Sequence, residues 1–104
     1  MALHGYIMKS YFIELFGNSP QVKVLDFFIA NYWEAWSMVE ISKEIKAGYS
    51  TLKILLPRLV KKDFLKVKKK VGKINFYELN LKNPVILRLV QFDWALIKHG
   101  IGVK

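Results

Sequence analysis

Cysteine is absent from the 104-residue sequence, and histidine is nearly absent. The lack of cysteine excludes disulfides, thiolate metal sites and cysteine nucleophiles, and it fits a reducing compartment such as the cytoplasm. Only His4 and His99 are present, one near each end of the chain. Because zinc and related metals need clusters of such ligands, we expect no metal site and no metal-sensing role.

Long apolar runs and targeting signals are also missing. No run approaches the roughly 20 residues that span a bilayer, and residues 1–9 lack the basic start and the cleavage site of a signal peptide. We therefore expect no membrane partner. The length suits one compact domain, and a hydrophobic content of 53% favours a packed core over disorder.

Motifs that carry catalysis are not found. The sequence has no glycine-rich phosphate loop, no nucleophile elbow and no histidine–acid pair at metal-ligand spacing. Glu40 and Glu44 lie one turn apart on an exposed helix face, and nothing predicts paired carboxylates in a cleft. We expect a protein that is not an enzyme and needs no cofactor.

Positive charge, in contrast, is plentiful and concentrated in one segment. The net charge is +9, and residues 46–82 hold 11 of the 17 basic residues but only 2 of the 8 acidic ones. The rest of the chain is neutral in sum. This segregation indicates a polyanionic partner. The alternative is a solvated lysine surface that only keeps the protein soluble.

Helix-start signals and helical periodicity predict three helices in the first two thirds of the chain. Ser19 and Pro20 begin the first one. Ser37 and Glu40 form a capping box at the start of the second, with a short strand just before it. After a break of about three residues, a leucine stripe predicts a third helix over residues 49–62. So short a turn predicts a helix-turn-helix, with an ordinary helical hairpin as the alternative.

A lysine-rich hairpin is predicted after the third helix. Residues 64–70 alternate like a strand, Gly72 supplies a turn, and residues 74–79 are rich in strand-forming side chains. Helix-turn-helix followed by a hairpin is the order expected of a winged helix. If the apolar residues of the first strand point inward, its alternate lysines share one outer face: Lys66, Lys68 and Lys70.

The last helix, capped by Asn83 and begun by Pro84, is apolar on most of its sides. One stripe consists of Val85, Leu89, Phe92 and Leu96, and it is extended by Ile86, Val90 and Ile97. Such a helix needs its own domain and a second partner to bury against, and the amino-terminal segment around Tyr6 and Ile7 adds further apolar surface. We expect a homodimer through both ends of the chain, with intramolecular core as the alternative. The predicted interface residues are Tyr11, Phe12, Leu15, Leu89, Phe92 and Leu96.

The predicted fold class is therefore α+β, mainly α: a single winged helix-turn-helix domain over residues 1–104. Residues 1–17 form an amino-terminal segment, residues 18–82 the core and residues 83–100 a carboxy-terminal dimerisation helix.

An ordered series of short stretches strengthens this interpretation. The stretches are Leu15-Phe16-Gly17-Asn18-Ser19-Pro20, Val24-Leu25-Asp26-Phe27, Ser50-Thr51-Leu52, Leu56-Pro57-Arg58-Leu59, Val71-Gly72-Lys73, Phe76-Tyr77-Glu78-Leu79-Asn80, Asn83-Pro84 and Ala95-Leu96-Ile97-Lys98. Over roughly residues 15–99 the chain resembles short archaeal winged-helix regulators of the MarR/ArsR-like superfamily. The resemblance implies a dimeric DNA-binding transcription regulator. Two positions depart from the pattern: Lys46 replaces a usual glycine, and Ile54 replaces a common basic residue.

Two groups of side chains are candidates for contact with double-stranded DNA. On the third helix, the amino end meets base edges in the major groove, Ile54 can touch a thymine methyl, and cations grip phosphates. On the hairpin, lysines suit phosphates or the minor groove. The candidates are Tyr49, Ser50, Thr51, Lys53, Ile54, Arg58 and Lys61 on the helix, and Lys66, Lys68, Lys69, Lys70 and Lys73 on the hairpin.

Each group has a plainer alternative. Tyr49 can pack over the turn, Ser50 and Thr51 can cap the helix, and Pro57 can mark a kink. Hairpin lysines also protect an edge strand from aggregation. We expect a cytoplasmic, nucleoid-associated transcription regulator. The alternatives are a non-specific, chromatin-like DNA coat and a winged helix used for protein–protein contact in a transcription complex, although the latter favours a hairpin of mixed charge.

Overall fold

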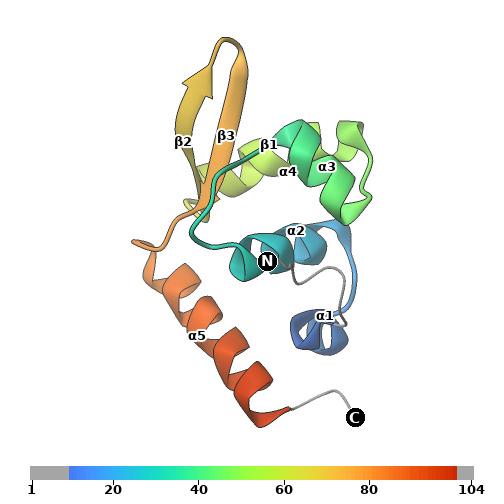
Figure 1. Cartoon of the computed structure of the whole chain (residues 1–104), viewed down its shortest axis with the longest axis vertical. Coiled ribbons are helices and arrows are strands. Elements are labelled where there is room, and N and C mark those ends of the chain that lie inside the picture. The colour runs from blue at the N-terminus through green and yellow to red at the C-terminus, as the bar shows by residue number, and fades with distance from the viewer. Residues whose placement is uncertain (1–9, 101–104) are drawn as a thin grey trace.

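A computed structural model of the chain describes residues 10–100 and has an α+β fold that is mainly helical (Figure 1). Expectations for residues 1–9, including those for His4, Tyr6 and Ile7, lie outside this range. In chain order the elements are α1 (Tyr11–Phe16), α2 (Pro20–Ala30), β1 (Trp36–Ser37), α3 (Met38–Ile45), α4 (Tyr49–Lys61), β2 (Leu65–Val71), β3 (Ile74–Leu79) and α5 (Pro84–His99). The strands form an antiparallel sheet in the order β1-β3-β2.

The predicted helix starts are confirmed by their hydrogen bonds. The Ser19 side chain accepts a bond from the Val22 amide at 3.3 Å. At α3, the Ser37 side chain accepts from the Glu40 amide at 3.2 Å, while the Glu40 carboxylate accepts from the Ser37 amide at 2.8 Å. Each cap satisfies amides that have no partner inside the helix, and such caps stabilise a helix by about 1 kcal/mol. These caps therefore fix where α2 and α3 begin.

The core lies where α2, α3 and α4 meet the base of the hairpin and one side of α5. The least exposed of its large side chains are Phe27, Phe28, Ile29, Ile41, Leu52, Leu56, Leu59, Leu65, Leu79 and Ile86. The leucine stripe of α4 is buried as its spacing predicts, which leaves the opposite side of α4 to solvent. The hairpin extends beyond the core and away from the helices (Figure 1).

The buried side of α5 differs from the predicted stripe. Its buried residues are Ile86, Val90, Asp93 and Leu96. Leu89 packs at the edge of the core, whereas Val85 and Phe92 are exposed. The prediction is therefore confirmed for Leu96 and for Ile86 and Val90, which extend the predicted stripe, and wrong for Val85 and Phe92. The reason is that apolar residues on most sides of α5 leave its periodicity ambiguous.

Two predicted interface residues belong instead to the interior of this chain. Phe12 on α1 is only 3% exposed and Leu96 on α5 only 4%. Side chains already covered within one chain offer almost no further area to a partner, so assigning Phe12 and Leu96 to an intersubunit contact was wrong. Leu15 and Phe92 are exposed, and Tyr11 is half-buried.

Candidate nucleic-acid interface

Three residues, Lys46 to Gly48, join α3 to α4. Lys46 has a φ of 56° and a ψ of 35°, the left-handed conformation that favours glycine. The Ser42 hydroxyl donates to the Ala47 carbonyl at 2.8 Å and fastens the turn to α3. Glycine would adopt this conformation at lower cost, and Lys46 adopts it despite its side chain.

The amino end of α4 is open to solvent. Gly48 is its N-cap, and no side chain caps the helix. Ser50 and Thr51 therefore do not serve as caps, and both are exposed. Tyr49 is 50% exposed, so its ring is not simply packed over the turn. An uncapped helix start offers amide donors and the positive end of the helix dipole to an anion.

The outer side of α4 carries three exposed cations around an apolar centre. Lys53, Arg58 and Lys61 are exposed, and none of them forms an ion pair within residues 10–100. Ile54, at the centre of this side, is 64% exposed. Pro57 is exposed and interior to a helix that continues to Lys61. This side is therefore suited to phosphate contact and poor in groups that hydrogen-bond to bases.

A shallow hollow of about 310 Å³ lies between α4 and the start of α2. Thr51, Ile54 and Arg58 line it from α4, facing Ser19 and Gln21. The hollow places the amino end of α2 beside the Arg58 side chain. A phosphate there would meet a guanidinium and a helix start together.

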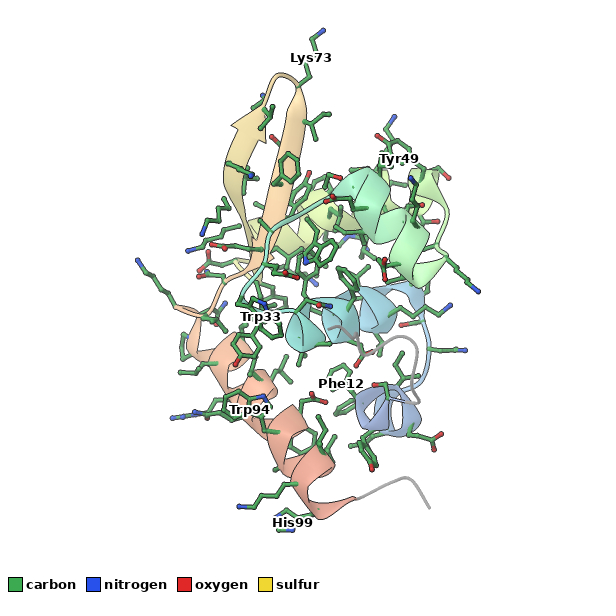
Figure 2. The ribbon with its side chains drawn as sticks, in the orientation of Figure 1. Phe12, Trp33, Tyr49, Lys73, Trp94 and His99 are labelled. Carbon is green, nitrogen blue, oxygen red and sulfur yellow. The ribbon has the colours of Figure 1, made fainter. Side chains whose placement is uncertain are left out.

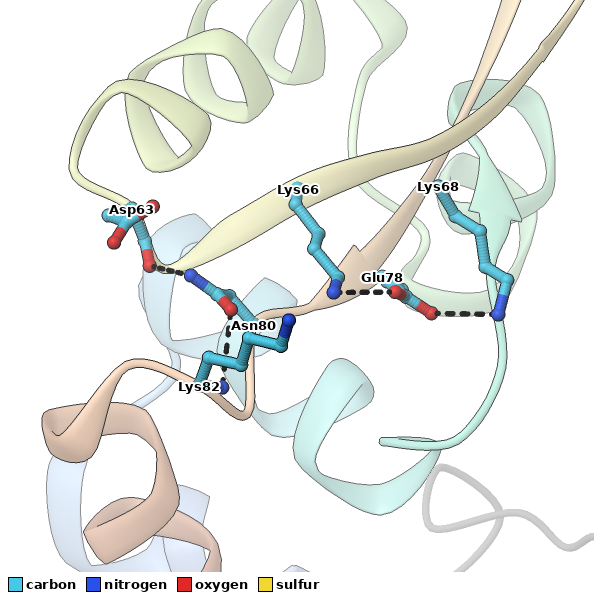
Figure 3. Close-up of polar contacts among 6 residues, drawn as sticks. All are labelled: Asp63, Lys66, Lys68, Glu78, Asn80 and Lys82. Carbon is cyan, nitrogen blue, oxygen red and sulfur yellow. Dashed lines mark hydrogen bonds and ion pairs between the residues drawn. The ribbon is translucent and has the colours of Figure 1, made fainter.

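The lysines at the base of the hairpin are already paired. Glu78 on β3 lies between two of them, with its carboxylate 3.3 Å from the Lys66 ammonium and 3.6 Å from that of Lys68 (Figure 3). The Glu78 side chain is only 14% exposed, whereas the two lysines are 42% and 58% exposed. The three charges therefore contribute a net charge of only about +1 to the surface, less than the lysine count suggests.

A β-bulge in β2 changes the faces of the hairpin on which its lysines lie. The cross-strand pairs are Lys66 with Glu78, Val67 with Tyr77, Lys69 with Phe76 and Lys70 with Asn75, with a register shift between Val67 and Lys69. The extra residue puts Lys69 on the face of Lys66 and Lys70 on the opposite face. The expected shared face of Lys66, Lys68 and Lys70 is therefore wrong. Lys69 instead lies over the ring of Phe76, 4.9 Å from its centroid.

The hairpin tip, residues 70–74, combines cations with an exposed apolar pair. Gly72 has a φ of 63° while Lys73 does not have a positive φ, as in a type II′ turn. Lys70 and Lys73 are exposed and make no ion pair in the described part of the chain. Val71 and Ile74, which face each other across the strands, are 57% and 54% exposed. This apolar pair was not predicted, although its place beside the glycine turn puts it beyond reach of the core.

The base of the hairpin is tied to the end of α4 and the start of α5. Asp63, with a φ of 67°, presents its backbone carbonyl to the side-chain amides of Asn80 at 3.0 Å and Asn83 at 2.9 Å. The Asn80 side-chain oxygen accepts from the Lys82 amide at 3.2 Å (Figure 3). These bonds hold the hairpin at a fixed angle to α4.

The start of α4 and the hairpin tip lie toward the same end of the molecule's long axis. Figure 2 shows Tyr49 and Lys73 at that end and His99 at the other, with Trp94 and Phe12 between. The structure therefore brings Tyr49 at the start of α4 and Lys73 at the hairpin tip toward one end, and leaves Lys66 and Lys68 engaged with Glu78.

The structure also brings together a carboxylate pair that was not predicted. Asp26 on α2 and Asp93 on α5 both line a pocket between α1, α2 and α5. Burial, together with the charge of Asp26, raises the pKa of the Asp93 carboxyl from 3.8 to about 6. The expectation of no paired carboxylates in a cleft was wrong. The sequence feature that could have indicated this pair is the single acidic residue in each of two apolar helices, Asp26 in α2 and Asp93 in α5.

Comparison with models of protein families, with curated proteins and with solved structures found no match to this chain. Within residues 10–100, no helix has both the length and the apolar character needed to cross a membrane. In the same range, no group of three or more histidines or acidic residues is placed to hold a metal ion.

Proposed function

We propose that this protein is a winged-helix transcription regulator that binds double-stranded DNA as a homodimer. One observation carries the proposal: the uncapped start of α4 lies toward the same end of the molecule as the cations of the hairpin tip. These cations have no acidic partner among the described residues. The order of helices and strands, with a hairpin directly after α3 and α4, supports the winged-helix assignment.

In this proposal α4 enters the major groove with its amino end toward the bases. Tyr49, Ser50 and Thr51 offer hydroxyl groups to base edges or phosphates, and Ile54 offers an apolar surface to a thymine methyl. The cations farther along α4 contact phosphates on both sides of the groove, which orients the helix without reading sequence.

The hairpin acts as the wing and contacts the DNA beside the major groove. Its tip supplies Lys70 and Lys73, and the exposed Val71 and Ile74 give it an apolar edge suited to a groove wall. Lys66 and Lys68 contribute less net attraction because Glu78 accompanies them. The wing therefore binds mainly through its tip.

The dimer forms at the other end, through α1 and α5. Leu15 is 52% exposed and Phe16 49%, and the Phe16 ring lies 6.0 Å from that of Phe92, which is 40% exposed. These three side chains form an apolar surface next to the core that a second copy can cover. To contact successive major grooves, the two α4 helices of this dimer must lie about 34 Å apart, one turn of DNA.

A competition gel-shift tests the proposal. The labelled probe is a fragment selected from a random DNA pool by this protein, and the competitors are the same fragment unlabelled and a scrambled one. A regulator requires the selected competitor to displace the probe at far lower concentration than the scrambled one. Failure of the random pool to yield any bound fragment would contradict DNA binding and favour a winged helix used for protein–protein contact.

A non-specific DNA coat is the second candidate, favoured by the chemistry of the outer side of α4. Its centre is Ile54 and Pro57, neither of which hydrogen-bonds to a base, and its cations suit phosphates. Equal competition by the selected and scrambled fragments would establish this alternative over the regulator.

A further inference from the structure

A pocket of about 460 Å³ lies between α1, α2 and α5, and it shares no residue with α4 or the hairpin. The described residues that line it are Ser10, Tyr11, Asp26, Ile29, Ala30, Tyr32, Trp33, Asp93, Trp94 and Ile97. Four are aromatic, two are acidic and none is basic. The volume falls within the range of small-molecule sites, which are mostly apolar with a few polar groups.

The walls of the pocket are rich in aromatic faces. The ring of Tyr32 lies 4.9 Å from that of Trp33 and 5.9 Å from that of Trp94. Trp33 is 62% exposed and Trp94 53%, large fractions for tryptophan side chains on a folded chain. Figure 2 shows these two tryptophans near each other, where the end of α2 faces α5. Aromatic faces carry negative potential and attract cations.

Asp93 is a buried acidic group in the wall of this pocket. It is only 9% exposed, yet its carboxylate makes no hydrogen bond or ion pair within residues 10–100. An ionised carboxylate in this setting is unfavourable unless a positive group joins it. Asp26, which accepts a hydrogen bond from the Ser10 hydroxyl at 2.7 Å, adds a second acidic group to the same pocket.

We propose that this pocket binds a hydrophobic organic cation, with Asp93 as its counter-ion and the tryptophans as its aromatic walls. A divalent metal ion fits poorly, because calcium and magnesium require six or more oxygen ligands and the walls are aromatic and aliphatic. An organic anion would face two carboxylates. The site is separate from the candidate DNA interface and does not depend on DNA binding.

Tetraphenylphosphonium, a permanent cation, is the probe for this site, and tetraphenylborate is its control of similar shape and opposite charge. Each is titrated into the full chain at pH 7.5 without DNA, with binding measured by calorimetry and by tryptophan fluorescence. The cation is expected to bind at one site per chain and at least tenfold more tightly than the anion. Binding no tighter than that of the anion would overturn the proposal.

Two variants assign the binding to the pocket. Asp93→Asn is expected to weaken tetraphenylphosphonium binding at least tenfold, while Glu44→Gln, which removes a similar charge from the exposed face of α3, changes it less than twofold. A thermal melt of each variant verifies that it is folded. Equal binding by Asp93→Asn and the native chain would overturn the assignment, even if the native chain binds the cation.

The pH dependence provides a second readout that needs no substitution. Among residues 10–100, the other titratable groups that line the pocket are Asp26 on α2, Tyr11 on α1 and Tyr32 after α2. Because protonation of Asp93 removes the counter-ion, affinity for the cation is expected to fall by up to tenfold per pH unit below about pH 6. An affinity unchanged between pH 7.5 and pH 5 would contradict the role of Asp93.

Discussion

At the scale of single residues, Lys46 has a conformation that its side chain disfavours. A non-glycine residue in the left-handed region costs roughly 1 kcal/mol or more, and glycine avoids most of this at some cost in chain entropy. We predict that Lys46→Gly raises the free energy of unfolding by about 0.5–1 kcal/mol in denaturant titrations. Lys46→Ala is the matched control, because it removes the charge but keeps the Cβ atom. Equal stability of the two variants would show that the backbone conformation is not the cause.

Asp93 links the stability of the fold to pH. Its pKa rises from 3.8 to about 6 on folding, so the folded chain holds more protons between these values and loses stability as the pH increases through them. A shift of this size corresponds to roughly 3 kcal/mol. We predict that Asp93→Asn stabilises the protein by about 1–3 kcal/mol at pH 7.5.

The same substitution should have almost no effect near pH 4, where most of the native Asp93 is protonated. Chemical denaturation of both proteins at the two pH values measures the difference. A stabilisation of equal size at both values would contradict a buried charge as its source.

At the scale of elements, the base and the tip of the hairpin carry different effective charge. Removing the Glu78 charge releases Lys66 and Lys68 for phosphates, so Glu78→Gln should increase DNA affinity several-fold and steepen its salt dependence. Fluorescence anisotropy with a labelled duplex measures both. The control is Glu14→Gln, an exposed acid on α1 at a distance from α4 and the hairpin. An affinity no greater than that of the control would mean that these two lysines do not face DNA.

Local signals predicted most elements, because the bonds that begin a helix join neighbours in sequence. Ser19, Ser37 and Gly72 marked starts and a turn that the structure confirms. The bulge in β2 was not predicted because its position is set by pairing with β3, and four lysines in the five residues 66–70 leave the alternation uninformative. The buried side of α5 was not fully predicted for a related reason, because apolar residues lie on most sides of the helix.

The candidate sites also include features that local sequence predicted and features that it could not predict. The outer side of α4 followed from its leucine stripe, because the buried side of a helix determines the exposed one. The pairing of Lys66 and Lys68 with Glu78 depends on the bulge that shifts the register of β2 against β3. The meeting of Asp26 with Asp93 depends on contact between α2 and α5, which are distant in sequence. No local pattern could have placed those groups together.

At the scale of the whole molecule, the surfaces proposed for DNA binding and for self-association lie toward opposite ends. Leu15→Glu places a charge in the apolar surface on α1 and should convert a dimer into a monomer at tens of micromolar, as measured by light scattering. Val39→Glu is the matched control, because Val39 on α3 is 51% exposed against 52% for Leu15. A native chain that is already monomeric at this concentration would refute the dimer.

The central claim, that α4 and the hairpin tip grip DNA phosphates, is tested most directly by the salt dependence of binding. If about 5 phosphates are neutralised per subunit, the logarithm of the binding constant should fall against the logarithm of salt concentration with a slope of roughly −9 per dimer. The double variant Lys70→Ala, Lys73→Ala should reduce the magnitude of that slope by about 3 to 4. A native slope near zero, or a slope that the double variant leaves unchanged, would contradict the account.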